Sequence, residues 1–347
     1  MKNIFNIQTE ADFRQKCLET FRYQYQNIKV YRKFVDYLNI DPTKVHEVDN
    51  IPFLPIEMFK NHTILDHTKN TELYFQSSGT TQMNLSKHWI ADEKLYRESI
   101  AKSFEQFIGK PEDFVFLGLL PSYLEKQNSS LIYMVNFLME KSGKPENGYF
   151  LYNHNELLEL LQKLAVEDKK VILFGVSFAL LDFLDFAQSD PRFGKSSAQL
   201  TIIETGGMKG RKEEMTKDEL LGILQKGFGT DRIYSEYSMT ELLSQAYSLG
   251  HNIYESPNWM RVLIRNTEDP FSYVEKGRSG AINIIDLANQ YSCSFIATQD
   301  LGKIIVDPEP FSVPESVLKG PKVLSDRFQV LGRIDHSDIR GCSLLVS

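Results

Sequence analysis

Short apolar runs of strand length constrain the fold of this 347-residue chain more than any other feature. Residues 113–120, 170–175 and 200–204 are rich in Val, Ile, Leu and Phe, and each run ends near Gly or Pro. Apolar residues with helical spacing stand beside them, at 92–107 and 131–139. Strands that alternate with helices usually form a largely parallel sheet covered by helices. The pattern therefore predicts an α/β fold.

The ends of the chain have a different texture. Residues 9–38 carry apolar side chains every three to four positions, which predicts amphipathic helices, with Cys17 on the apolar stripe as a core residue. Residues 281–285 and 294–297 predict strands of a second, more antiparallel sheet. We expect one catalytic domain over 1–347, made of a helical region (1–70), an α/β core (71–250), a β-rich subdomain (251–330) and a tail (331–347).

Composition excludes several classes of protein. Hydrophobic residues make up 42% and charged residues 24%, which is ordinary for a soluble globular enzyme. The net charge of −7 argues against a general nucleic-acid or anionic-membrane surface, because either needs a basic face. No apolar segment of signal-peptide length follows Met1, and the apolar stretch 171–181 is too short to span a bilayer.

The three cysteines are Cys17, Cys293 and Cys342. They have no CxxC spacing and no nearby His cluster, so the sequence predicts neither a disulfide framework nor a zinc site. We therefore expect a reduced, cytoplasmic protein.

A run of hydroxyl side chains around a glycine follows a short apolar stretch, at Ser77-Ser78-Gly79-Thr80-Thr81. Hydroxyls and free backbone N–H groups supply many donors without bulk, as a loop around polyphosphate oxygens needs. A polar surface turn has the same composition.

A second cluster, residues 234–241, follows another expected strand. It contains Tyr237, Thr240 and Glu241: an aromatic ring, a hydroxyl and a carboxylate. A nucleotide site uses such groups against adenine, on phosphate and on Mg²⁺, although a solvated loop would also have this composition. Asp300 follows an expected strand and could accept ribose hydroxyls, or it is a turn residue. Residues 332–342 hold many charges and resemble a surface loop.

The order of these pieces resembles the adenylate-forming (ANL) superfamily of acyl-CoA ligases, luciferases and adenylation domains. The succession is SSGTT, GG after a strand, Y-x-M-T-E, T-x-D-L-G and G-R-x-D. Residues 51–57, 120–125 and 204–211, with the ending at Cys342, narrow the resemblance to the acyl-protein synthetase (LuxE) family. It covers about residues 45–347.

The resemblance implies ATP-dependent activation of a carboxylic acid, with Mg²⁺ offsetting the repulsion between carboxylate and triphosphate. It also implies a role for each matching residue. The phosphate loop would consist of Ser77, Ser78, Gly79, Thr80 and Thr81. Adenine would lie close to Gly206 and Gly207, and Tyr237 would pack on the base. Thr240 would contact phosphate, Glu241 would hold Mg²⁺, and the ribose would be bound by Asp300 and Arg333.

The chain departs from the superfamily in two places. Gln82 stands where Gly is usual, and Lys87 comes later than the usual loop lysine, so we assign Lys87 no role. The sequence also stops at Ser347, without the C-terminal domain that supplies a catalytic lysine. Acyl-protein synthetases carry the acyl group on a cysteine near the C-terminus, and Cys342 matches that position. Nearby cations such as Arg340 would lower the pKa of a thiol there; Cys293 is the weaker candidate.

The leading hypothesis is therefore formation of an acyl-adenylate from a carboxylic acid, with a fatty acid expected, followed by transfer to Cys342 as a thioester. Delivery to an acyl-CoA reductase-like partner is implied by the resemblance. Residues 114–120 and 131–139 could line an acyl pocket, but an ordinary core explains them as well. One alternative is a CoA ligase similar to phenylacetate-CoA ligase. Another is a non-catalytic nucleotide-binding module.

Overall fold

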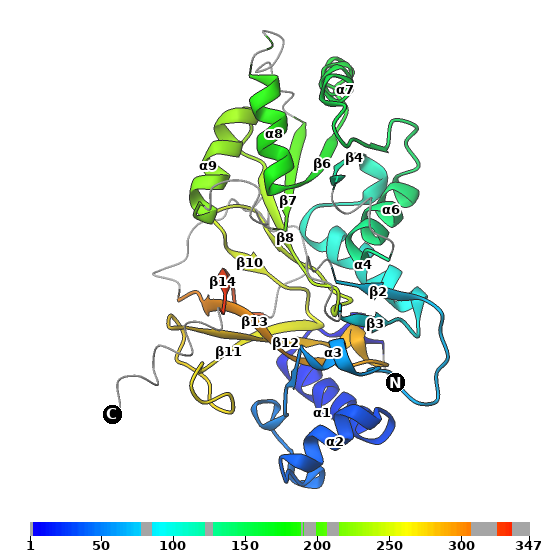
Figure 1. Cartoon of the computed structure of the whole chain (residues 1–347), viewed down its shortest axis with the longest axis vertical. Coiled ribbons are helices and arrows are strands. Elements are labelled where there is room, and N and C mark those ends of the chain that lie inside the picture. The colour runs from blue at the N-terminus through cyan, green and yellow to red at the C-terminus, as the bar shows by residue number, and fades with distance from the viewer. Residues whose placement is uncertain are drawn as a thin grey trace. The chain divides into compact units, whose positions relative to one another are not determined.

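The chain divides into two units, which we describe separately (Figure 1). The central unit comprises Thr71–Tyr254, and the split unit joins Met1–Asn70 to Glu255–Ser347. The structure is a computed structural model, and it describes residues 3–77, 85–121, 128–188, 190, 199–206, 215–306 and 325–334.

A parallel sheet forms the middle of the central unit, with strands in the order β8-β7-β6-β4-β5. Every residue of β4, β6 and β7 is buried, because helices cover the sheet. The three apolar runs are therefore confirmed as buried parallel strands. The bounds are β4 Val115–Leu119, β5 Gly148–Tyr149, β6 Val171–Val176, β7 Leu200–Thr205 and β8 Ile233–Tyr237, with antiparallel β9 (Ala246–Ser248) beside β8.

Helices cover both faces of this sheet. Figure 1 shows α8 (Ser177–Ala187) and α9 (Lys217–Phe228) on one side and α4 (Glu93–Phe107) and α6 (Ser130–Ser142) on the other. A capping box begins α9: the Thr216 hydroxyl accepts from the Glu219 N–H, and the Glu219 carboxylate accepts from the Thr216 N–H. The remaining helices in the described part of the unit are α7 (His154–Val166) and the short helix η4 (Pro111–Asp113).

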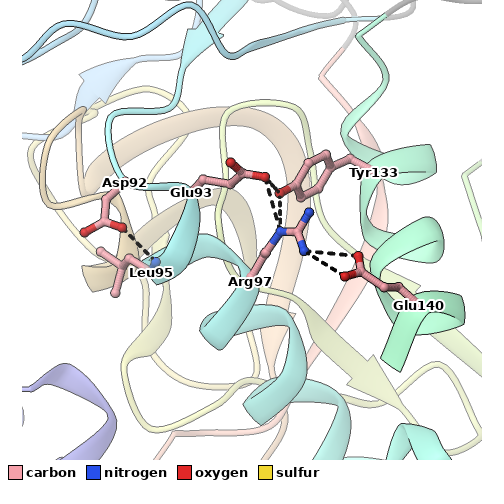
Figure 2. A network of polar contacts seen from close by, with 6 residues as sticks. All are labelled: Asp92, Glu93, Leu95, Arg97, Tyr133 and Glu140. Atoms are coloured by element: carbon pink, nitrogen blue, oxygen red, sulfur yellow. Dashed lines mark hydrogen bonds and ion pairs between the residues drawn. The ribbon is translucent and has the colours of Figure 1, made fainter. Parts of the chain in front are cut away.

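An arginine joins α4 to α6 (Figure 2). Arg97 donates from Nε to the Tyr133 hydroxyl (2.9 Å) and from Nη1 to Glu140 Oε2 (3.1 Å). The Tyr133 hydroxyl in turn donates to Glu93. The ring of Tyr133 is stacked on Tyr96 of α4, with 5.3 Å between ring centroids. The contacts fix the two helices against each other on this face of the sheet.

A separate two-stranded hairpin, β2 (Tyr74–Gln76) and β3 (Lys87–Trp89), packs on this aromatic pair. The Phe75 ring lies 5.5 Å from the Tyr96 ring and 5.2 Å from the Tyr133 ring, centroid to centroid. Because Phe75 is 2% exposed, the start of the expected phosphate loop is anchored in the core of the unit.

The split unit combines N-terminal helices with an antiparallel sheet ordered β11-β12-β13-β14. The strands expected at 281–285 and 294–297 are confirmed within β12 and β13, and the helices expected over 9–38 are α1 and α2. The bounds are α1 Glu10–Asn27, α2 Lys29–Tyr37, α3 Met58–Asn61, β1 Leu54–Pro55, β11 Met260–Arg265, β12 Ser279–Asp286, β13 Phe295–Ile304 and β14 Phe328–Arg333, with short helices η1 Ile4–Asn6, η2 Pro42–Lys44, η3 Val48–Asn50 and η5 Leu287–Asn289. Strand β10 is Tyr254–Glu255.

A buried amide fixes α1 in the split unit. Gln24 is fully buried, and its Nε2 donates to the Asn289 carbonyl (2.9 Å) and to Ser294 Oγ (3.0 Å). Its Oε1 accepts from the Ser294 N–H (3.0 Å). The amide is thus satisfied at both ends, as a buried polar group requires. No helix among the described residues is both long and apolar enough to cross a membrane.

Candidate active site

The carboxyl ends of β7 and β8 form the edge where an open α/β sheet binds its ligands. Thr205 and Glu236 are opposite each other in the parallel register, so Gly206 and Tyr237 follow at neighbouring positions on this edge. Gly206 has φ +74°, a left-handed conformation that favours glycine. The structure therefore brings the glycine and the tyrosine expected at adenine to one edge.

Beneath this edge lies an ion pair to which the sequence analysis gave no role. Glu204, the fifth residue of β7, is fully buried and accepts hydrogen bonds from Lys217 Nζ and Ser177 Oγ. Burial alone would lower the pKa of Lys217, but attraction to Glu204 and hydrogen bonds to Glu204 and Tyr254 raise it. Lys217 therefore stays charged, and the network fixes the end of β7.

A second buried carboxyl group, Glu236, lies beside the first on β8. Its Oε2 accepts from the Thr205 hydroxyl at 2.6 Å. Burial raises the pKa of Glu236 despite hydrogen bonds from Ser238 and Thr205. Each glutamate is the penultimate residue of its strand, and an acidic residue near the carboxyl end of a strand was the available sequence signal for both.

The residues expected to contact base, phosphate and Mg²⁺ follow β8 directly. Tyr237 is half-buried, and its ring centroid lies 6.0 Å from that of Tyr254. Thr240 is half-buried, and Glu241 is 6% exposed. These side chains are therefore partly or fully packed against the protein beside the carboxyl end of β8. They are not part of a solvated loop.

Backbone and side-chain contacts connect the hairpin to this segment. The Ser77 N–H donates to the Ser86 carbonyl (3.1 Å), and the Ser86 N–H donates to Ser77 Oγ (3.1 Å). Two residues further along, the imidazole of His88 lies with Nδ1 2.9 Å from the Thr240 carbonyl oxygen. The structure thus brings the first residue of the expected phosphate loop and the Thr240–Glu241 segment onto one connected framework.

The expected ribose contacts face each other in the split unit. Asp300 on β13 pairs with Arg333 on β14 in the antiparallel register, and Arg333 Nε lies 3.3 Å from Asp300 Oδ1. The arginine side chain is 77% exposed and the aspartate side chain 14%. An ion pair whose arginine is this exposed contributes little stability.

Several predicted residues lie outside the described residues: Ser78, Gly79, Thr80, Thr81, Gly207 and Cys342, together with Gln82. Lys87, which the sequence left without a role, lies with Nζ 5.0 Å from the centroid of the Tyr74 ring, a cation–π contact at the surface of the hairpin.

The two described cysteines are poor nucleophiles. Cys17 and Cys293 are both fully buried. Burial raises the pKa of Cys17, and it raises the pKa of Cys293 to about 12, against a smaller lowering by the Phe295 backbone. Cys17 is thus a core residue, as its place on the apolar stripe predicted, and Cys293 is held as a thiol.

The donors at the strand edge fit a nucleotide with its magnesium. Among the described residues no group of three or more His, Cys, Asp or Glu side chains could hold a metal ion by itself. Protein-bound Mg²⁺ usually takes one or two carboxylates and completes its shell with phosphate oxygens and water. A single carboxylate such as Glu241 beside Thr240 therefore suits Mg²⁺ carried by ATP, and it does not suit a free metal centre.

The described part of the split unit also contains a cavity of about 800 Å³. Phe34, Phe53 and Tyr273 line it together with Glu57 and Arg265. Neither of the segments considered for an acyl pocket, 114–120 and 131–139, contributes to it.

Solved structures of adenylate-forming enzymes share this fold. A 2-hydroxyisobutyryl-CoA ligase in complex with 2-HIB-AMP and CoA matches with a TM-score of 0.66 and 12% identity, over 94% of this chain and 70% of that one. ATP-bound MatB from Rhodopseudomonas palustris matches with a TM-score of 0.50 and 15% identity, over 75% of this chain and 47% of that one. A luciferase-like enzyme from the mealworm Zophobas morio matches with a TM-score of 0.52 and 13% identity, over 77% of this chain and 59% of that one.

At these identities the likeness concerns the fold, and it confirms the predicted fold class. No curated protein matches the sequence. The model of one protein family, described as acyl-protein synthetase, LuxE, matches residues 5–347. Nearly the whole chain is therefore covered, and the protein belongs to the acyl-protein synthetase (LuxE) family.

Proposed function

We propose that this protein activates a fatty acid with ATP and then carries the acyl group on Cys342. In the first step a carboxylate oxygen attacks the α-phosphorus of ATP, and pyrophosphate leaves. In the second step the Cys342 thiolate attacks the acyl carbonyl, the thioester bond forms, and AMP leaves with the electron pair of the broken C–O bond. The thiol proton passes to solvent or to a neighbouring base.

The observation that carries the proposal is the framework at the carboxyl edge of β7 and β8. Gly206 and Tyr237 lie on this edge, and the Thr240–Glu241 segment follows β8. The hairpin of β2 and β3, whose first strand leads into Ser77, is attached to this segment through His88. A nucleotide bound there would have a ring for its base, a hydroxyl for its phosphates and a carboxylate for Mg²⁺. When bound, Mg²⁺ would neutralise charge on the triphosphate and on the departing pyrophosphate.

The second step is supported by the state of the other thiols. Cys17 and Cys293 are buried and held protonated by burial, which leaves Cys342 as the cysteine that the family resemblance assigns. We further propose that the acyl group passes to an acyl-CoA reductase-like protein in the cytoplasm. Label transferred from the acylated protein to such a reductase, and lost with Cys342→Ser, is the expected result.

Carboxylate-dependent exchange of labelled pyrophosphate into ATP tests the first step. Exchange that depends on an added fatty acid is expected, and Glu241→Gln should lower it about 100-fold or more because the magnesium contact is lost. Glu156→Gln, an exposed carboxylate on α7, is the matched control and should match wild type. No exchange across short, long and aromatic acids would favour a binding module instead.

The location of the acyl product separates a protein acylase from a CoA ligase. With labelled fatty acid, ATP and CoA, the label should stay with the protein, in a form that hydroxylamine releases. Label that appears in CoA thioester only, with none on the protein, would contradict the second step and leave the first intact.

A further inference from the structure

The hairpin formed by β2 and β3 contains a buried imidazole, His88, to which the sequence motifs assign no role. His88 is fully buried and stands opposite Phe75 in the antiparallel register, so both side chains lie on the same face of the hairpin. Phe75 contacts Tyr96 and Tyr133, the rings that join α4 to α6. His88 is therefore held in a rigid part of the central unit.

The hydrogen bond from this imidazole has one chemical direction. A carbonyl oxygen can only accept, so the proton of the His88–Thr240 bond is on Nδ1. Burial lowers the pKa of His88 to about 4, against a smaller raising by the bond to the Thr240 backbone. The ring is therefore neutral at pH 7, and its single N–H is the one on Nδ1.

We infer that His88 is a positioning residue: its Nδ1–H holds the Thr240 carbonyl and thereby fixes the Thr240–Glu241 segment beside the hairpin from which the phosphate loop begins. The inference deepens the proposed function and rests on it for the roles of Thr240 and Glu241. His88 itself touches no reacting atom. Without this bond, the hairpin would no longer hold the Thr240–Glu241 segment, which carries the proposed magnesium ligand, in a fixed position.

A second contact fixes the same segment further along the chain and supplies a control. Ser99 Oγ of α4 lies 3.1 Å from Ser244 Oγ, and both side chains are fully buried. This contact is four residues beyond Thr240 and involves neither the hairpin nor the Thr240 carbonyl. Ser99→Ala therefore removes a different buried hydrogen bond to the same stretch of chain without disturbing the connection that we assign to His88.

The test compares three replacements of His88. Asparagine places an amide N–H on Cγ, where Nδ1 is attached, whereas leucine has no donor and glutamine carries its donor one atom further out. His88→Leu and His88→Gln should lower kcat/KM of acid-dependent exchange about 10- to 100-fold, mainly through KM for Mg·ATP, and His88→Asn should recover to within about threefold of wild type. Ser99→Ala should stay within about twofold. Thermal unfolding identifies any variant that does not fold. If His88→Leu does not fold, the polar variant His88→Gln serves as the replacement that lacks the Nδ1 donor.

A binding measurement separates this inference from the proposed function. Equilibrium dialysis with ATP, with and without Mg²⁺, requires no turnover, and the gain in affinity from Mg²⁺ should shrink about tenfold in His88→Gln but not in His88→Asn. If wild type shows no exchange, the function fails while this comparison still decides the role of His88. Equal effects of asparagine, glutamine and leucine, or none from any of them, would overturn the inference.

Discussion

The two units handle charge at their proposed ligand sites in opposite ways. In the central unit the carboxylate of Glu204 is fully buried and bonded to Lys217 and Ser177. In the split unit the Asp300–Arg333 pair is open to solvent on the arginine side. The first arrangement is fixed before a nucleotide arrives, because its charges already have partners. In the second arrangement the arginine side chain is exposed, and the pair is the proposed contact for the ribose.

Removing one half of the buried ion pair should have the largest effect. Lys217→Met leaves the Glu204 carboxylate buried without its cation, which should lower the free energy of unfolding of the central unit by about 3–5 kcal/mol. The double variant Lys217→Met/Glu204→Gln should recover much of this loss. Urea unfolding followed by Trp89 fluorescence, in a Trp259→Phe background, reports this unit because the chain has only two tryptophans. If Lys217→Met were as stable as wild type, the ion pair with Glu204 would not be a fixed part of the central unit.

The polar core of the split unit should prove purely structural. Gln24→Leu removes the partner of the Ser294 N–H and the Asn289 carbonyl, so the free energy of unfolding should fall by about 2–3 kcal/mol. Urea unfolding followed by Trp259 fluorescence, in a Trp89→Phe background, measures the loss, and Gln15→Ala on the exposed face of α1 is the control. KM for ATP should not change; a rise would show that this core also serves the nucleotide site.

Acid should weaken the central unit through His88. The folded-state pKa of about 4 lies below the ordinary value of 6.5, so the unfolded chain binds the proton first as the pH falls. The stabilisation is present above pH 6.5 and is lost as the pH falls toward 4, with about 2 kcal/mol gone by pH 5. We would measure the free energy of unfolding of wild type and of His88→Asn from pH 8 to pH 5. The difference between the two proteins should shrink by about 2 kcal/mol over this range, because only wild type has the imidazole. Parallel curves would contradict a neutral buried imidazole.

The exposed pair should matter for the ligand and hardly for stability. Arg333→Ala should change the free energy of unfolding by less than about 0.5 kcal/mol, because a surface ion pair contributes little. KM for ATP in the exchange assay should rise about tenfold, the loss of one charge-assisted contact. Arg278→Ala, which removes the exposed Arg278–Glu275 pair of the same unit, is the control and should leave KM unchanged.

The sequence predicted the elements of the fold because their signals are local. The buried strands β4 and β6 appear as continuous apolar runs and β7 as an isoleucine-rich run, and α4 and α6 appear as apolar residues at helical spacing. Asp300 and Arg333 were found through motifs and turn out to be register partners.

The supporting residues of the site could not be found in this way. His88 contacts Thr240 across 152 positions of sequence, and no periodicity connects a histidine in a three-residue strand with a distant backbone carbonyl. Glu204 and Lys217 are 13 residues apart and pair only because α9 returns beside the end of β7. Such contacts depend on topology, whereas the helix and strand signals depend on neighbouring residues.

Intact-protein mass spectrometry after incubation with ATP, Mg²⁺ and a fatty acid tests the central claim most directly. Wild type should gain the mass of one fatty acid less one water, hydroxylamine should remove the adduct, and peptide mapping should place it on Cys342. Cys342→Ser should show no adduct while its acid-dependent pyrophosphate exchange continues. An adduct that persists in Cys342→Ser, or that maps to Cys293, would contradict the account.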